Sequence, residues 1–142
     1  MAVSIQAASI KDVTRRSGLP EATLRYYERI GLIAPVPRDG SSGHRRYDPA
    51  TVDTIEALAC LRAAGMSIDD MRAYLDGMSD ATRQRELFER HSARLADEIE
   101  RLRVRRRYLD AKVRLWGARE RGDTAEEQRA ADEVLAVTGE LR

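Results

Sequence analysis

The chain has 142 residues, of which 42% are hydrophobic, 35% charged and 5% aromatic, and its net charge is +1. This length allows one compact domain with an extension but not two full domains. One cysteine excludes an intramolecular disulfide, no apolar run reaches the ~20 residues that a membrane helix needs, and residues 1–9 lack the pattern of a secretory signal. We therefore expect a cytoplasmic protein without a membrane partner.

The small net charge hides an uneven distribution along the chain. Residues 1–47 carry eight Lys/Arg and four Asp/Glu, which gives +4, whereas residues 48–79 carry two and six, which gives −4. A local surplus of positive charge is typical of a surface that binds nucleic acid. The first third of the sequence is therefore the expected DNA-binding region.

The first two predicted helices form a helix-turn-helix. Ser9 can cap a helix over residues 10–16, with Asp12 three positions later, and Gly18 follows its end. Pro20 suits the first position of a second helix, which continues to about residue 30. Two short helices separated by a glycine-containing turn predict a helix-turn-helix, and the second helix of such a unit enters the major groove of DNA.

The second helix presents a polar face if Leu24, Tyr27 and Ile30 pack inward. Arginine can bind a guanine edge or a phosphate, and hydroxyl groups can bind phosphate. The alternative is a solvated helix whose arginines pair with neighbouring glutamates, as Arg25 can with Glu21. The outward-facing side chains that we expect to contact DNA are Thr23, Arg25, Tyr26 and Arg29.

Residues 35–47 predict a small β-wing. Pro35 and Pro37 force an extended chain, and the Gly and Ser residues at 40–43 supply a tight turn between two short strands. By itself such a basic segment is typical of a solvated surface loop, but beside a helix-turn-helix it predicts contacts with the same DNA. The expected wing contacts are Arg38, His44, Arg45, Arg46 and Tyr47.

Four more helices are expected after the wing. Apolar residues at helical spacing predict one helix over residues 50–64, and Ser67 caps the next, which ends near Gly77. A long helix follows over residues 80–120. Gly122 ends it, and a capping box at residues 124–127 begins a final short helix that runs to about residue 137.

The long helix carries an apolar heptad repeat. Large apolar side chains recur every seven residues, and a second series lies four residues after them. Ser92 and Arg106 are polar members of the second series, and such residues can fix the register of a coiled coil. The arginines at 101–107 are expected to be solvated, with phosphate contact as the alternative. The repeat predicts a dimer seam that contains Phe88, Leu95, Ile99, Leu102, Leu109, Val113 and Trp116.

Several fragments of the first half form a combined pattern that is specific, although each is weak alone. They are IKDV (10–13), SGL (17–19), TLRYYE (23–28), GLI (31–33), Arg38, GHRRY (43–47) and LRAAGMSI (61–68). Together they resemble the MerR family of bacterial transcriptional regulators over residues 8–78. Where this chain has His44, the family usually has tyrosine.

The resemblance implies a mainly α protein with three regions. These are a winged helix-turn-helix DNA-binding domain over 8–78, a dimerising coiled-coil helix over 79–121, and a short C-terminal helix or tail over 122–142 as an effector region. It implies a homodimer that binds an inverted repeat in double-stranded promoter DNA. Effector binding then distorts the DNA so that RNA polymerase can engage the promoter. By the family pattern, the DNA contacts are Arg25, Tyr26, Arg38, His44, Arg45 and Tyr47.

The effector class stays open between two alternatives. Cys60 lies in a stretch similar to that of the aldehyde- and thiol-responsive branch of the family, which implies a sensor of thiol-reactive compounds; otherwise it packs as a small apolar residue. A small organic effector would need a pocket lined by Tyr108, Trp116 and Val134, which are core residues in the alternative interpretation. One cysteine and two distant histidines disfavour a metal-responsive regulator, and no cofactor is expected.

Two other classes of function compete with a regulator. An enzyme is disfavoured because the sequence has no nucleophile elbow, no glycine-rich phosphate loop and no metal-ligand spacing. A coiled-coil interaction module without a specific DNA target would explain residues 80–120, but it leaves the basic wing without a purpose. A DNA affinity that falls steeply with salt would separate a regulator from such a module.

Overall fold

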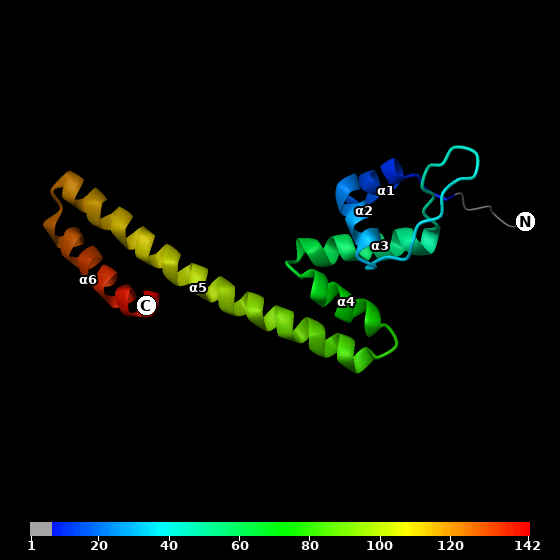
Figure 1. The fold of residues 1–142 in the computed structure, drawn as a ribbon. Coiled ribbons are helices and arrows are strands. Elements are labelled where there is room, and N and C mark those ends of the chain that lie inside the picture. The colour runs from blue at the N-terminus through cyan, green and yellow to red at the C-terminus, as the bar shows by residue number, and fades with distance from the viewer. Residues whose placement is uncertain (1–6) are drawn as a thin grey trace, which may run out of the picture. The chain divides into compact units, whose positions relative to one another are not determined.

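A computed structural model describes residues 7–142, and it confirms the mainly α fold (Figure 1). Residues 1–6, part of the segment expected to lack a secretory signal, lie outside the described part. The described helices are α1 (Ile10–Ser17), α2 (Glu21–Arg29), α3 (Pro49–Ala63), α4 (Ile68–Asp76), α5 (Ala81–Arg121) and α6 (Thr124–Leu141). The chain divides into two compact units, one that ends at Gln84 and one that begins at Arg85, so the boundary falls within the first turn of α5. Among these helices, none has the length and apolar character to cross a membrane.

Local capping sets where the helices of the first unit begin. Ser9 Oγ accepts a hydrogen bond from Asp12 N at 3.2 Å, and Asp12 Oδ2 accepts one from Ser9 N at 3.2 Å, so the predicted capping box forms. Ser67 and Asp70 form the same arrangement at the start of α4. Pro20 is the N-cap of α2 and not its first helical residue, because its ψ of 150° is extended. The two capping boxes satisfy N–H groups that a helix end leaves without partners, whereas Pro20 makes no such side-chain hydrogen bond.

The first unit packs around one core to which its helices and the end of the wing contribute. Val52, Ile55 and Leu58 lie on one side of α3 at the predicted helical spacing, and each is at most 1% exposed. Complete burial of a side chain of this size contributes about 1.5–3 kcal/mol. The core holds α2 and the wing in place through its buried members Val13, Leu19, Leu24, Tyr27, Leu32, Ile33, Val36, Tyr47, Val52, Ile55, Leu58 and Met71.

The wing is held by isolated backbone pairs where the sequence predicts two short strands. Arg38 pairs with Arg45 across the loop, and Ala8 pairs with Tyr47 at its base. Ala8 N donates to the Tyr47 carbonyl oxygen and Tyr47 N donates to that of Ala8, both at 2.8 Å. Pro37 lacks an N–H group, so a regular ladder cannot continue through it. The expectation of strands was therefore wrong in extent, although the wing itself forms.

The second unit is a helical hairpin in which α6 runs back along the C-terminal part of α5 (Figure 1). Its fully buried side chains are small, and they are Ala111, Ala118, Ala130 and Val137. Ion pairs across the hairpin join Arg107 to Glu140, Arg114 to Glu126 and Arg119 to Glu127. Small buried side chains and exposed ion pairs therefore hold the two helices of the hairpin together.

The final helix begins and ends at other residues than the sequence predicts. Asp123 is its N-cap, because Asp123 Oδ1 accepts a hydrogen bond from Glu126 N at 3.0 Å. Thr124, the predicted start of a capping box, is the first helical residue. The helix continues to Leu141 and not to about residue 137, since Val137 is buried in the hairpin.

Candidate nucleic-acid interface

The second helix of the helix-turn-helix, α2, presents the polar face that the sequence predicts. Leu24 is completely buried and Tyr27 is 2% exposed, so these two side chains anchor the helix in the core. Arg25 and Arg29 are exposed, and Tyr26 between them is 42% exposed. The guanidinium of Arg29 lies 5.4 Å from the centre of the Tyr26 ring, a cation–π contact. These residues can reach a partner without any change in the core.

The ion pair considered as an alternative at the sequence level does form on α2. Arg25 Nη2 lies 3.3 Å from Glu21 Oε2, and the two side chains are 49% and 37% exposed. An ion pair this exposed contributes about 0–1 kcal/mol. It therefore holds Arg25 only weakly, and a DNA phosphate or a guanine edge can replace Glu21 as its partner.

A stronger contact ties the wing to α2. Arg45 Nε donates to Glu28 Oε2 at 3.1 Å, and the two side chains are only 23% and 20% exposed. This pair joins the wing to the last turn of α2, although the two residues lie 17 positions apart in the sequence. Arg45 is thereby held in one orientation beside the recognition helix.

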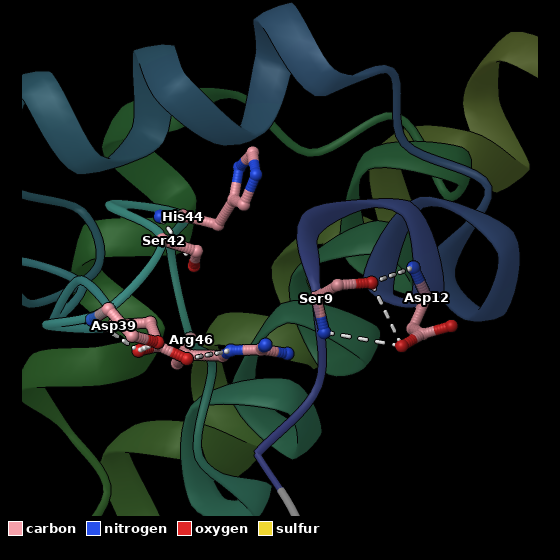
Figure 2. A network of polar contacts seen from close by, with 7 residues as sticks. Ser9, Asp12, Asp39, Ser42, His44 and Arg46 are labelled. Atoms are coloured by element: carbon pink, nitrogen blue, oxygen red, sulfur yellow. Dashed lines mark hydrogen bonds and ion pairs between the residues drawn. The ribbon is translucent and has the colours of Figure 1, made fainter.

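The turn of the wing is ordered by Asp39 (Figure 2). Asp39 Oδ1 accepts hydrogen bonds from Ser41 Oγ at 2.7 Å and from Ser41 N at 2.9 Å, and these lower the pKa of Asp39 to about 2. Arg46 Nε lies 3.4 Å from Asp39 Oδ2, and the Arg38 guanidinium donates to the Gly43 carbonyl oxygen at 3.4 Å. Arg38, His44 and Arg46 remain exposed, as a DNA contact requires.

Tyr47 lies underneath the wing and not on its surface. The residue has no exposed area, and within residues 7–142 no group forms a hydrogen bond with its hydroxyl. Burial raises the pKa of Tyr47 above its usual value, and the charge of Glu28 adds to the rise. In this conformation Tyr47 supports the wing from the core, and the DNA contact expected for it stays a prediction that requires its hydroxyl to become exposed.

Residues from α1, α2 and the wing surround a hollow of about 360 Å³. Arg25, Arg38 and Arg45, all predicted DNA contacts, line it together with His44. In Figure 2 the imidazole of His44 points away from the Asp39–Arg46 pair, and Ser9 at the start of α1 is visible in the same view. The fold thus brings the recognition helix and the wing to one basic surface.

Arg62 joins the interface, although sequence reasoning did not select it. Arg62 Nη1 donates to Thr23 Oγ1 at 3.4 Å, across 39 residues of sequence. With Thr23, Tyr26 and Ser67 it lines a second hollow, of about 320 Å³, beside α2. The sequence offers only one weak signal for this role of Arg62, namely its place in the last turn of α3, just before Gly65.

Comparison with known proteins agrees with this arrangement. The family of MerR HTH regulatory proteins matches residues 8–78. The chain belongs to this family. The HTH-type transcriptional regulator AdhR of Bacillus subtilis is 43% identical to it over 94 residues, which are 66% of this chain and 64% of AdhR. The chain thus spans slightly less than two thirds of that relative.

Solved structures of MerR-family proteins share the fold of this chain. A MerR-family regulator from Listeria monocytogenes superposes with a TM-score of 0.64 at 27% identity, over 89% of this chain and 98% of that one. HiNmlR, a MerR-family regulator that lacks the sensor domain and was crystallised bound to promoter DNA, gives 0.60 at 24% identity, over 82% and 95%. The second likeness shows a common fold.

The predicted dimer seam of this MerR-family chain is exposed to solvent along α5. Every one of its seven members is exposed. The exposed fractions are 39% for Phe88, 50% for Leu95, 42% for Ile99, 50% for Leu102, 61% for Leu109, 72% for Val113 and 58% for Trp116. Large apolar side chains exposed in one stripe are typical of a helix whose partner is another chain.

The residues considered for effector sensing belong to different units of the chain. Cys60 is exposed on α3. Tyr108 and Val134 are half-buried in the hairpin of the second unit, where a packing role suits them, while Trp116 is exposed under the Arg119 guanidinium, 4.7 Å from its ring centre. Across residues 7–142, no three His, Cys, Asp or Glu side chains gather as a metal site would require.

Proposed function

We propose that the chain acts as a homodimer that binds an inverted repeat in double-stranded promoter DNA and controls transcription. One observation carries the proposal: Arg25 of α2 and Arg38 and Arg45 of the wing line the same hollow on the exposed side of a MerR-family helix-turn-helix. Arginines on one surface bind phosphates and guanine edges together. A buried core fixes them there in advance.

The exposed stripe on α5 supports the dimer. A coiled coil would remove its apolar side chains from water, and a two-fold axis would repeat the DNA-reading surface once. Two symmetric readers require two half-sites in opposite orientation, which is an inverted repeat. The proposed target follows from this symmetry.

Control of transcription is proposed to operate through DNA shape. Twisting or bending a duplex stores deformation energy that depends on its sequence, so an effector that changes the dimer can change the DNA between the half-sites. RNA polymerase would then engage the distorted promoter. HiNmlR, which shares the fold, was crystallised with promoter DNA, and this supports duplex DNA as the partner.

Cys60 is the residue that we propose for sensing a thiol-reactive electrophile such as an aldehyde. Its exposure makes the sulfur accessible to a small molecule, and Arg62 lies two residues further along the chain. A thiol reacts as its thiolate, which neighbouring positive charge favours. A non-covalent organic effector of the second unit is the competing proposal, supported by the exposed Trp116 ring.

Selection of duplexes from a random pool tests the DNA target. We expect one enriched inverted repeat, and we expect Arg25→Ala to weaken binding to it by about 1–3 kcal/mol while relaxing the preference at one base pair of each half-site. No enriched sequence, with weak binding that disappears at moderate salt, would leave the chain as a coiled-coil interaction module.

Treatment with a small aldehyde tests the sensor. DNA distortion, followed by the reactivity of unstacked bases, should change on treatment of the natural chain and not of Cys60→Ser. An equal response in both proteins would reject Cys60 as the sensor and favour a non-covalent effector.

A further inference from the structure

Four cationic side chains meet around the hollow between α1, α2 and the wing, and one of them belongs to neither DNA-reading element. Arg25, Arg38 and Arg45 come from α2 and the wing, whereas Lys11 comes from the first turn of α1. The sequence places Lys11 on the first predicted helix, and Lys11 was not among the predicted DNA contacts. The structure instead places it on the basic surface.

The charges around this hollow are only partly balanced. Arg25 pairs with Glu21 at 3.3 Å, and Arg45 pairs with Glu28 at 3.1 Å. In the described chain, neither Lys11 nor Arg38 forms an ion pair. The positive charges of Lys11 and Arg38 are therefore not balanced by an acidic side chain of the described residues, and they repel each other unless an anion lies between them.

The nearest acidic residue on α1 does not supply that anion. Asp12 follows Lys11, but its carboxylate accepts hydrogen bonds from the Ser9 backbone and hydroxyl and from Arg15. These contacts lower the pKa of Asp12, so the group stays ionised and committed to the start of α1. The excess charge at the hollow is therefore available to a ligand.

The size and chemistry of the hollow fit a phosphate group. A volume of about 360 Å³ admits a phosphodiester with the edges of its two sugars. Arginine binds phosphate oxygens through its planar fork, and lysine binds them as a compact point charge. Because Glu28 holds Arg45 in one orientation, part of the site is already formed before a ligand arrives.

We propose that this hollow holds one phosphodiester of the bound duplex, and that Lys11 of α1 is its contact outside the recognition helix and the wing. The inference rests on the proposed function, because it names which part of the DNA the hollow takes. Lys11 contacts only the backbone, so it contributes affinity and register and no sequence preference.

The salt dependence of DNA binding by the full-length chain tests this contact. The plot of log K against log salt has a negative slope, and each phosphate contact that is lost makes it shallower by about 0.9, so Lys11→Ala should make it shallower by about 0.9 per subunit. Affinity should fall about fivefold on every sequence alike. Arg16→Ala is the matched control, because Arg16 is an exposed cation of the same helix that pairs with Glu56 and does not line the hollow.

Replacing single backbone linkages by uncharged methylphosphonates locates the phosphate. We expect one linkage per half-site whose neutralisation weakens binding of the natural chain and of Arg16→Ala more than it weakens binding of Lys11→Ala, in which only the three arginines of the hollow still contact that phosphate. A free phosphate ion offers the same chemistry, so binding of inorganic phosphate is measured by calorimetry in parallel. Phosphate binding lost in Lys11→Ala, without coupling to any linkage, would assign the hollow to a free anion and overturn the DNA contact.

The outcomes separate this inference from the proposed function. If the natural chain selects no sequence, both fail. If it selects an inverted repeat, and Lys11→Ala remains folded by circular dichroism but keeps the natural salt slope, only the role of Lys11 fails. A reduced slope in Lys11→Ala, restored in Lys11→Arg, supports the proposal because the positive charge alone is then sufficient.

Discussion

The two units of the chain bury different kinds of side chain. The first unit encloses its large residues, among them Leu24, Ile55, Leu58 and Tyr47, each without exposed area. The second unit buries mainly alanines and leaves residues as large as Leu109 and Trp116 more than half exposed. The first unit therefore satisfies its apolar side chains within one chain, while the second does not.

This difference indicates where the second chain of the proposed dimer would pack. Exposed apolar area gains stability only when another surface removes it from water, at about 25 cal/mol per Å². The hairpin of α5 and α6 already covers the alanine side of α5. The heptad side stays open, and it is there that a second copy would complete the core.

A charge in the open stripe should have the largest effect. Leu102→Glu would place an unpaired carboxylate in the proposed seam of each subunit, and a buried unpaired charge costs about 3–5 kcal/mol. We expect sedimentation to show a change from dimer to monomer, with loss of inverted-repeat binding. Leu135→Glu, on α6 at 73% exposure, is the matched control and should stay dimeric. If the Leu102→Glu protein remains dimeric, the stripe that contains Leu102 is not the dimer interface.

A cavity in the closed core should have the next largest effect and remain confined to the first unit. Leu58→Ala removes a completely buried side chain of α3, and such changes cost about 2–5 kcal/mol. Native-state hydrogen exchange should show faster opening of α1 to α4 with little change in the hairpin of α5 and α6. Equal acceleration in both regions would mean that the two units unfold as one.

Loss of the cap at the hairpin turn should have a smaller effect. Asp123→Ala removes the acceptor for Glu126 N, and the loss of an N-cap costs about 1 kcal/mol. We expect faster exchange in the first turn of α6, while Asp123→Asn, which keeps an oxygen acceptor, stays close to the natural chain. A similar effect of both variants would point to the charge of Asp123 and not to its hydrogen bond.

Acid should weaken the hairpin by the smallest amount. Hydrogen bonds from Arg114 and Arg129 lower the pKa of Glu126 below its ordinary value of 4.5. Because the folded-state pKa is the lower one, this carboxylate adds stability above about pH 4.5, and the contribution disappears as pH falls through the lowered pKa. The melting temperature of the hairpin should therefore fall on acidification, and less so in Glu126→Gln. Parallel pH profiles would reject this role.

Features set by neighbouring residues were predictable from the sequence. The capping boxes at Ser9 and Ser67 and the apolar side of α3 depend on residues within one or two helical turns, and all of them form. The heptad stripe is similarly local, because the helical repeat alone places its members on one face. The sequence could therefore identify a mainly α chain with a basic reader and an open apolar stripe.

Features set by distant residues were not predictable. The pairing of Ala8 with Tyr47 determines that this tyrosine is buried, and no local pattern distinguishes it from the exposed residues before it. The contact of Arg62 with Thr23 and the place of Lys11 beside the wing likewise depend on how α1, α3 and the wing pack. The small residues at the hairpin contact also escaped notice, because alanine carries little hydrophobic signal.

The two hydrogen bonds between Ala8 and Tyr47 close the chain into a loop that contains the helix-turn-helix and the wing. Both amides are held at 2.8 Å from their acceptors, so they exchange with solvent chiefly when this closure opens. The exchange rates of these two amides therefore measure how often the Ala8–Tyr47 pair opens, and no chemical label on the DNA-reading region is required. A fusion partner attached ahead of Ala8 would be joined to this closure, whereas a fusion after α6 would leave it untouched.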